Sequence, residues 1–319
     1  MNTHAREMKV FTANAIPHLA KEMASILGLP LGESEVSTFS DGEIEVNIGE
    51  SVRGTDVFVV QSTSNPVNKH LMELLIMIDA FKRASAGRIT AVVPYFGYSR
   101  QDRKSKARDP ISARLVADLI SVAGADRILT MDLHSPQIQG FFSIPVDDLQ
   151  GMSILAPYFK DRFRGKLDEI ICVSPDLGSV ARARAFSHRV GTGLAIIDKR
   201  RQKANSSEVM NIIGDVKGKT VIIVDDMIDT AGTLCNAAAA VMELGGAREV
   251  YAAATHGVLS GEAVERIEKS YLKEVVLLDT ISIPNEKKIQ KLRFLSVSGV
   301  FAQAVERIYT DKPISPLFN

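Results

Sequence analysis

The sequence predicts an α/β fold in which parallel strands alternate with helices. Short apolar runs rich in Val and Ile recur along the chain, and longer segments with apolar residues at helical spacing separate them. The chain has 319 residues, of which 45% are hydrophobic, so it can bury two cores of ordinary size. The expected strands are 56–61, 89–94, 127–132, 170–174, 194–198, 220–225, 249–255 and 274–279.

Helices are expected between these strands. The segment 68–85 has apolar residues at helical spacing, and Gly87 follows it as a stop signal. The segments 112–123 and 233–244 show the same spacing, and each ends before a glycine. These segments therefore predict the crossover helices that join parallel strands.

The series of strand, loop and helix runs twice, which predicts a duplicated domain. The best boundary is 145–153, because it holds turn residues and no sustained hydrophobic period. We expect a first domain at 1–150 and a second at 151–302. The tail, about 303–319, is expected to pack back on the first domain, and its two prolines argue against a helix at its end.

Charge and cysteine content exclude several classes of protein. Lys and Arg together number 38, as do Asp and Glu, so no overall field would attract nucleic acid or a membrane surface. No apolar run approaches the roughly 20 residues of a spanning helix, and we expect a cytoplasmic protein. Cys172 and Cys235 lie in apolar stretches, without the spacing of a zinc site, and are expected to be buried free thiols.

The most informative stretch is 221–233, which reads VIIVDDMIDTAGT. Its apolar run predicts a buried strand, and Asp225 and Asp226 come where that strand should end. Ligands of open α/β sheets bind at such ends. A loop of small and hydroxyl residues then enters a helix, so backbone N–H groups and hydroxyls can converge on a phosphate. The residues of this loop are Asp229, Thr230, Ala231, Gly232 and Thr233.

The two carboxylates before this loop suit the vicinal hydroxyls of a ribose whose 5-phosphate lies in the loop. The alternative is an ordinary strand, turn and helix with Asp and Thr as caps; the complete pattern favours the functional interpretation. No GxxxxGK[ST] motif occurs, which excludes a P-loop, and no well-placed GxGxxG supports a dinucleotide site.

Cations follow two other expected strands. Five of the ten residues 99–108 are Lys or Arg, and they face either a polyphosphate or only solvent, with neither interpretation favoured by this segment alone. Asp198, Lys199, Arg200 and Arg201 end a further strand. Cations on a mobile segment there could close over a reacting phosphate, or the run could simply be exposed.

His134 and Asp176 also follow strands, in ILTMDLH and VSPDLG. A single His in this position is more often structural. Beside an oxygen ligand it would suit a sparse Mg²⁺ site, in which substrate phosphates and water complete the coordination. The stretch FSDGE, from Phe39 to Glu43, predicts a hairpin turn and, taken alone, nothing more.

Taken together, VIIVDDMIDTAGT, YFGYSRQDRK, DLHSPQIQGFF, IIDKRR and FSDGE resemble the ribose-phosphate pyrophosphokinases, also called phosphoribosyl pyrophosphate synthetases. The resemblance covers nearly the whole chain and is greatest to the phosphate-activated bacterial class. It implies two domains of the type I phosphoribosyltransferase fold, with the active site between them. The implied reaction transfers the β,γ-pyrophosphoryl group of ATP to the C1 hydroxyl of ribose 5-phosphate, releases AMP and requires Mg²⁺.

The resemblance also implies roles for particular residues. Lys199 and Arg201 would be the catalytic cations, and Arg201 would also assist in binding the sugar phosphate. His134 and Asp176 would serve the magnesium site. The residues implied to bind ribose 5-phosphate are Asp225, Asp226, Asp229, Thr230, Ala231, Gly232 and Thr233. The residues implied to bind ATP are Phe39, Asp41, Gly42, Glu43, Arg100 and Gln101.

The FSDGE residues would reach ATP on a neighbouring subunit, which implies a homo-oligomer, a hexamer by the habit of the family. Phosphate and ADP are the implied allosteric effectors, with Arg53, Ser85 and Ser315 as contributors by position. Two positions depart from the family pattern: Ser179 replaces a second glycine, and Gln202 replaces a proline. We expect neither side chain to contact a reacting group.

Two other functions share parts of this pattern. A phosphoribosyltransferase that consumes the activated sugar would have the 229–233 loop, but would not need the basic loop or FSDGE. A noncatalytic regulatory homologue would share the fold, but the presence of Lys199, Arg201, His134 and the full phosphate loop argues against it.

Overall fold

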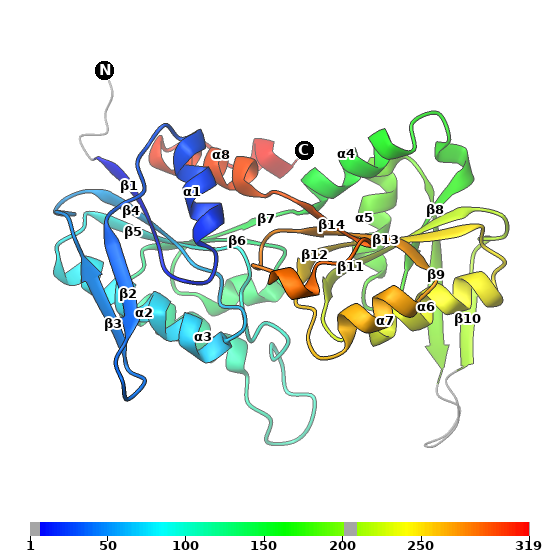
Figure 1. The fold of residues 1–319 in the computed structure, drawn as a ribbon, viewed down its shortest axis with the longest axis horizontal. Coiled ribbons are helices and arrows are strands. Elements are labelled where there is room, and N and C mark those ends of the chain that lie inside the picture. The colour runs from blue at the N-terminus through cyan, green and yellow to red at the C-terminus, as the bar shows by residue number, and fades with distance from the viewer. Residues whose placement is uncertain (1–6, 201–208, 319) are drawn as a thin grey trace. The chain divides into compact units, whose positions relative to one another are not determined.

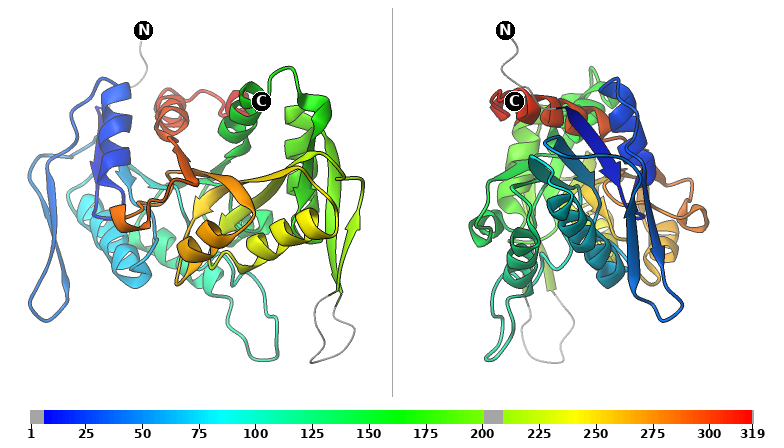
Figure 2. Two further views of the ribbon diagram at one scale, coloured as in Figure 1. Left: turned by 45° about the vertical axis from the view of Figure 1, so that its right-hand side comes forward. Right: turned by 90° about the vertical axis from the view of Figure 1, so that its left-hand side faces the viewer.

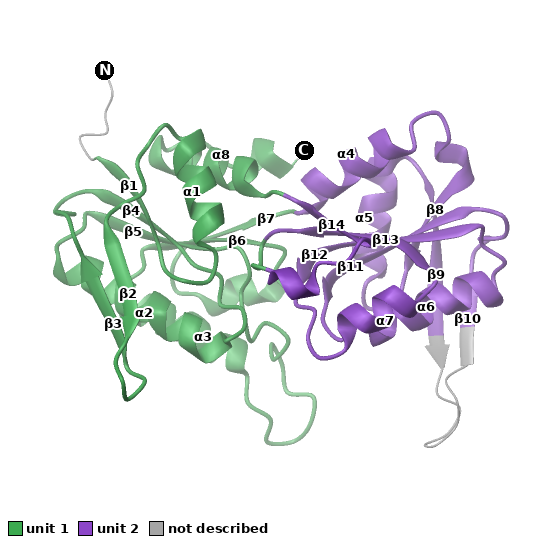
Figure 3. Cartoon of the chain, in the orientation of Figure 1, with its two compact units in different colours: residues 1–150, 280–282, 296–319 green, residues 151–279, 283–295 purple. Residues whose placement is uncertain are grey.

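The computed structural model describes residues 7–200 and 209–318, and the side chains in these ranges except at positions 199, 200, 209 and 210. The chain divides into two compact units (Figure 3). Unit 1 contains Met1–Gln150, Thr280–Ser282 and Ser296–Asn319, and unit 2 contains Gly151–Asp279 and Ile283–Leu295. The segment that returns to unit 1 at the end of the chain thus begins at Ser296, earlier than the residue 303 expected from the sequence.

Unit 1 is built on a five-stranded parallel sheet with strand order β1-β4-β5-β6-β7 (Figure 1). Its strands are β1 (Met8–Thr12), β4 (Asp56–Val60), β5 (Arg88–Val93), β6 (Arg127–Met131) and β7 (Val146–Leu149). Its helices are α1 (Pro17–Ile26), α2 (Val67–Arg83), α3 (Ser112–Ala123) and α8 (Ser298–Tyr309), with 3₁₀ turns η1 (Pro136–Phe141) and η4 (Ser315–Phe318). An antiparallel hairpin of β2 (Ser34–Thr38) and β3 (Ile44–Ile48) projects beyond this sheet (Figure 2).

Unit 2 is built on a seven-stranded sheet with strand order β10-β9-β8-β11-β12-β13-β14, parallel except for the edge strand β10. Its strands are β8 (Ile170–Ser174), β9 (Gly193–Arg200), β10 (Val209–Ile213), β11 (Thr220–Ile228), β12 (Glu249–Gly257), β13 (Leu272–Leu278) and β14 (Leu292–Leu295). Its helices are α4 (Met152–Arg162), α5 (Val180–Val190), α6 (Gly232–Glu243) and α7 (Ala263–Lys269), with 3₁₀ turns η2 (Leu167–Glu169) and η3 (Asn285–Lys287). The expected α/β class, with parallel sheets flanked by helices, is confirmed.

Both units follow one order of elements: strand, helix, antiparallel pair, strand, helix, strand, helix, strand, 3₁₀ turn, strand and helix. The series runs from β1 to α4 and again from β8 to α8, which is the order that a duplicated domain would leave. The last helix of each series is exchanged: α4 follows β7 but belongs to unit 2, whereas α8 follows β14 but belongs to unit 1. Each unit is therefore completed by a helix that follows the last strand of the other series.

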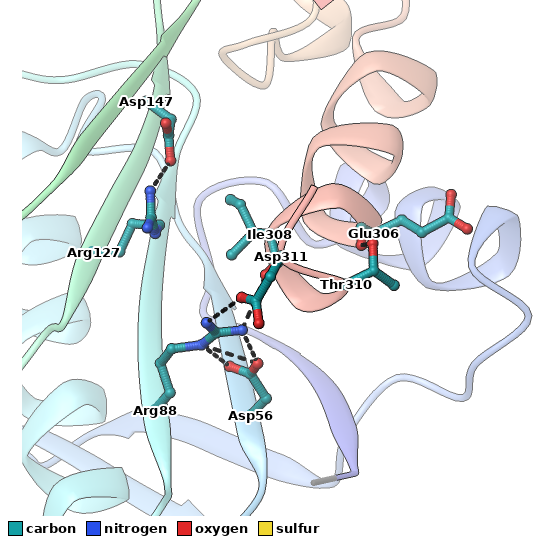
Figure 4. Close-up of polar contacts among 8 residues, drawn as sticks. All are labelled: Asp56, Arg88, Arg127, Asp147, Glu306, Ile308, Thr310 and Asp311. Carbon is teal, nitrogen blue, oxygen red and sulfur yellow. Dashed lines mark hydrogen bonds and ion pairs between the residues drawn. The ribbon is translucent and has the colours of Figure 1, made fainter. Parts of the chain in front are cut away.

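Helix α8 is held in unit 1 by apolar packing and by one charged cluster. Phe301, Ala302, Val305 and Ile308 are buried at helical spacing, so a single face of α8 packs on the unit. At its end, the guanidinium of Arg88 donates both to the buried carboxylate of Asp56, with Nε–Oδ1 at 3.0 Å, and to the carbonyl oxygen of Ile308, at 3.1 Å (Figure 4). The tail, expected to lack helix, ends in the short 3₁₀ turn Ser315–Phe318.

Candidate active site

Unit 2 contains a topological switch point between β8 and β11. The chain leaves β8 through α5 and returns on one side as β9, but it leaves β11 through α6 and returns on the other side as β12. The two connections diverge, which opens a crevice at the carboxyl ends of these strands, where doubly wound sheets bind ligands. Asp176 follows β8, and Asp225 lies on β11, so these two sequence-predicted residues of unit 2 lie at this switch point.

Strand β11 runs further than the sequence predicted. We expected it to end at Asp225, but it continues to Ile228. Its pairing with β12 extends to Ile228 opposite Gly257, whereas its pairing with β8 stops at Ile223 opposite Val173. Asp225 and Asp226 therefore lie on a part of the strand that is paired on one side only, beyond the last residue paired with β8.

The carboxyl group of Asp225 is in an unusual electrostatic environment. Burial, and after it the negative charges of Asp226 and Asp176, raise the pKa of Asp225 from 3.8 to about 7. The backbone N–H of Asp226 donates to Asp225 Oδ1 at 2.9 Å and partly offsets this shift. Burial and the two neighbouring carboxyl groups thus favour the protonated form of Asp225, as expected of a site that receives a cation or hydroxyl donors.

The loop after β11 presents backbone N–H groups at the start of α6. Ala231 occupies the N-cap position in the left-handed conformation, with φ of 60°, and α6 has no side-chain cap. A non-glycine residue in this conformation costs of order 1 kcal/mol and is found where function requires it. The first N–H groups of α6 are left for an anion, and Thr230 and Thr233 are exposed beside them.

Ser260, in the loop between β12 and α7, and Arg266, in the last turn of α7, hold this loop in place. The hydroxyl of Ser260 donates to the carboxylate of Asp229, and the backbone N–H of Ser260 donates to Asp229 O at 3.1 Å. Arg266 Nη1 donates to the carbonyl oxygen of Thr230 at 3.1 Å. Neither residue could be predicted from the sequence, because the motif gives no sign of partners more than 30 positions further along the chain.

Ser179 contacts Asp225, which corrects the expectation that this position touches no reacting group. Its hydroxyl donates to Asp225 Oδ1 at 3.1 Å, and its backbone N–H donates to Asp176 Oδ1 at 3.0 Å. Ser179 lies at the start of α5, beside the carboxyl end of β8, so the switch point brings it to β11. The departure from the family pattern was the only sequence signal for this residue.

The carboxylate oxygen of Asp176 suits a hard cation better than the nitrogen of His134 does. Magnesium prefers carboxylate oxygen, and a cation near Asp225 would oppose the burial and the neighbouring carboxyl groups that raise its pKa. His134 supplies nitrogen, which magnesium seldom takes, and it belongs to unit 1, after β6. In the described part of the chain, no group of three or more His, Cys, Asp and Glu side chains could hold a metal ion by itself. The pairing of His134 with Asp176 stays a prediction.

The two cations that we expected to be catalytic, Lys199 and Arg201, are only partly covered by the structure. We expected Lys199 on a flexible loop, but its backbone lies in β9, paired with Met210 of β10. We expected β9 to end at residue 198, but it continues for two more residues. Its backbone hydrogen bonds to the antiparallel strand β10 extend over these two residues. Arg201 and Gln202 lie outside the described residues.

The residues expected to bind ATP lie in unit 1, in two separate places. Phe39, Asp41, Gly42 and Glu43 form the exposed turn between β2 and β3, where Phe39 N donates to Glu43 O at 2.8 Å. The side chain of Phe39 is 49% exposed, which is unusual for a large aromatic residue. Arg100 and Gln101 lie in the loop after β5, where Ser112 donates to the side-chain carbonyl of Gln101.

The counterpart of the phosphate loop in unit 1 is closed. Strand β4 occupies the place of β11 in the order of elements, but the residues that follow it are buried. Gln61 Nε2 and Asn14 Nδ2 donate to the two oxygens of Glu73, at 2.8 and 2.9 Å, and Ser62 Oγ donates to Thr280 O at 2.6 Å. Buried, hydrogen-bonded groups of unit 1 thus occupy the position after β4 that corresponds to the loop after β11. Of the two described series, only the second has an open loop at this position.

The fold and this loop together define an α/β protein with a candidate anion site at the switch point of its second unit. Two family models match the chain: the N-terminal domain of ribose phosphate pyrophosphokinase over residues 8–124, and the phosphoribosyl synthetase-associated domain over residues 203–319. Curated ribose-phosphate pyrophosphokinases from Clostridium perfringens and Caldanaerobacter subterraneus subsp. tengcongensis are 61% and 63% identical to it, and the alignments cover 100% of both chains.

A solved structure resembles the whole chain. The crystal structure of phosphoribosylpyrophosphate synthetase from Mycobacterium smegmatis is 43% identical and covers 96% of this chain and 100% of its own, with a TM-score of 0.90. The chain therefore belongs to the ribose-phosphate pyrophosphokinase family. Its described helices include none that is long and apolar enough to cross a membrane.

Proposed function

We propose that this chain transfers the pyrophosphoryl group of ATP to the C1 hydroxyl of ribose 5-phosphate, giving 5-phosphoribosyl 1-pyrophosphate and AMP. Membership of the family at more than 60% identity over the full length supports this function. The observation that carries it is the uncapped start of α6 directly after a strand with two carboxylates, at the switch point of unit 2. That arrangement suits a ribose phosphate, with the phosphate on the N–H groups and the hydroxyls near Asp225.

In this reaction the C1 oxygen forms a bond to the β-phosphorus of ATP, and the bond from that phosphorus to the α,β-bridging oxygen breaks. AMP leaves with the electron pair, and the hydroxyl proton passes to solvent or to a carboxylate. The 229–233 loop holds the 5-phosphate, while Asp225 and Asp226 accept hydrogen bonds from the sugar. Positioning and neutralisation of charge supply the catalysis, without a covalent intermediate on the protein.

Lys199 and Arg201 are proposed to neutralise the charge that develops on the transferred group. Arg100 and Gln101 bind the ATP phosphates, and the exposed turn that contains Phe39, Asp41, Gly42 and Glu43 contacts ATP on a neighbouring subunit. A homo-oligomer follows from this last role, and a hexamer is proposed from the habit of the family that the chain resembles. Phosphate and ADP as effectors, and a cytoplasmic location, belong to the same proposal.

Mg²⁺ is proposed as the cofactor, held by Asp176 together with substrate phosphates and water, and with His134 as a second contributor. When bound, it would neutralise part of the polyphosphate charge. Asp225 and Asp226, with Ser179 beside them, would keep their oxygens directed toward the sugar. The raised pKa of Asp225, caused by burial and by the neighbouring carboxyl groups, is the observation that supports a cation here.

The test is to incubate the purified full-length chain with ATP, ribose 5-phosphate and Mg²⁺ and to measure AMP and the activated sugar by chromatography. Both products should appear in equal amounts, and neither should appear when the sugar or the metal is omitted. Folded protein that forms no AMP over a range of inorganic phosphate concentrations would overturn the proposal and favour a noncatalytic regulatory homologue.

A further inference from the structure

Ser179 occupies the N-cap position of α5, where a serine hydroxyl usually accepts a hydrogen bond from the first turn of its own helix. Here the helix has no side-chain cap. The hydroxyl instead donates to Asp225 Oδ1, 46 positions further along the chain, at 3.1 Å. Its hydrogen-bonding capacity is thus directed to a residue of the proposed sugar site.

The backbone of the same residue contacts the other carboxylate of the switch point. Ser179 N donates to Asp176 Oδ1 at 3.0 Å, and Ser174 Oγ donates to the carbonyl oxygen of Asp176 at 2.7 Å. These two hydrogen bonds fix the turn after β8 to the end of that strand. The hydroxyl of Ser179 then connects the turn to Asp225 on β11. Asp176 and Asp225 are linked through one residue.

The contact leaves Asp225 able to bind a ligand. Both Ser179 Oγ and the backbone N–H of Asp226 donate to the same oxygen, Oδ1, at 3.1 and 2.9 Å. A carboxylate has about four acceptor positions, so two donors on one oxygen fix the plane of the group and leave acceptor capacity for a sugar hydroxyl. Ser179 is half-buried and Asp225 is not fully buried, so a ligand can reach this pair.

We propose that Ser179 is a positioning residue that fixes the carboxylate of Asp225 in the orientation in which it accepts a hydrogen bond from ribose 5-phosphate. This inference rests on the proposed function and deepens it. Fixing a side chain before the ligand arrives removes the ordering cost that binding would otherwise bear. The hydroxyl therefore tightens the binding of the sugar phosphate without contacting ATP.

The experiment compares Ser179→Ala, Ser179→Gly and Ser179→Thr with the wild-type chain, using ribose 5-phosphate as the titrant in calorimetry and steady-state assays with each substrate varied. The first two variants should raise the Kd and KM for ribose 5-phosphate roughly threefold to tenfold, within the range that one intramolecular hydrogen bond usually contributes. Their KM for ATP should stay within about twofold of wild type. Threonine retains the hydroxyl, so Ser179→Thr should restore the affinity.

The matched control is Ser187→Ala. Ser187 lies on the same helix, and its hydroxyl donates to Arg184 O at 2.9 Å, away from the switch point. This variant should bind ribose 5-phosphate like the wild type, and thermal melts of all four variants report whether folding is affected.

Two results would overturn the inference alone: wild-type affinity in Ser179→Ala, or tighter binding, which would mean that the hydroxyl competes with the sugar. An equal rise of KM for ATP would also overturn it, since the effect would then be general. If the wild-type chain neither binds ribose 5-phosphate nor forms AMP from it, the proposed function itself fails.

Discussion

Arg88, in the middle strand of unit 1, donates through its guanidinium to the carbonyl oxygen of Ile308, 220 positions further along the chain, at 3.1 Å. The same guanidinium pairs with Asp56, whose side chain is 3% exposed, and lies 3.5 Å from Asp311. One side chain thus joins two neighbouring strands to the end of the exchanged helix α8. The hydrogen bond to Asp56 is the largest cause of the raised pKa of Arg88.

Replacing Arg88 by Met should destabilise unit 1. The substitution leaves the buried carboxylate of Asp56 without its cation and removes the hydrogen bond to α8, so we expect a loss of roughly 2–4 kcal/mol in the free energy of unfolding. Urea denaturation of the full-length chain, followed by circular dichroism, measures this change.

The control for this prediction is Arg83→Met. Arg83 pairs with Asp79 one helical turn away, and its side chain is 78% exposed, so its loss should cost less than about 0.5 kcal/mol. Equal destabilisation by the two substitutions would contradict the role assigned to Arg88.

Asp225 should make stability depend on pH. Its pKa is about 7 in the folded protein and near 3.8 when unfolded, so between these values the folded chain keeps a proton that the unfolded chain has lost. Stability therefore falls as the pH rises through this window. Asp225→Asn cannot titrate, so it should gain roughly 2–3 kcal/mol relative to wild type between pH 5 and pH 8 in metal-free buffer.

Thermal melts at the two pH values measure this difference. The exposed Asp215, which accepts only from Lys217 N, provides a control in Asp215→Asn, for which no such gain is expected. If the difference in stability between wild type and Asp225→Asn is the same at both pH values, the carboxyl group of Asp225 is not protonated in the folded protein at pH 5, and the prediction is wrong.

Thr233→Val should weaken the binding of ribose 5-phosphate. Thr233 is exposed in the first turn of α6, so its hydroxyl can donate to a phosphate on the loop. Valine has nearly the same shape and no donor, and the expected rise in KM for ribose 5-phosphate is roughly tenfold. The control is Thr192→Val. Thr192 lies just before the amino end of β9, with its hydroxyl against the thiol of Cys172, so its loss should leave the KM for ribose 5-phosphate unchanged.

Lys199→Ala should lower turnover more than substrate affinity. A cation that neutralises charge only in the transition state contributes to kcat, and the expected loss is roughly a hundredfold or more. Lys217→Ala removes an exposed lysine from the same unit and serves as the control. A Lys199→Ala enzyme with wild-type turnover would exclude Lys199 from catalysis.

Eight of the strands and the loop before α6 could be predicted because their signals are local, whereas the edge or terminal strands β1, β7, β10 and β14 were not predicted. Apolar runs identified strands such as Ile170–Ser174 with the correct bounds, and the motif at 221–233 identified the loop before α6. The end of β11 was wrong because it depends on how far the neighbouring strand β12 runs, which the sequence of β11 does not contain.

Features that depend on distant partners could not be predicted in the same way. The contact of Ser179 with Asp225 arises because α5 starts beside the end of β11, and the return of α8 to unit 1 begins at Ser296 because Phe301 and its neighbours find their apolar partners there. An amphipathic pattern shows that a helix will be buried, but it does not show in which unit.

The most direct test of the central claim uses ATP labelled with radioactive phosphorus at the β position. If the chain transfers a pyrophosphoryl group to ribose 5-phosphate, the label will appear in the sugar product and will be absent from AMP, with both products in equal amounts. Label recovered in ADP, with a sugar that has gained a single phosphoryl group, would contradict the account.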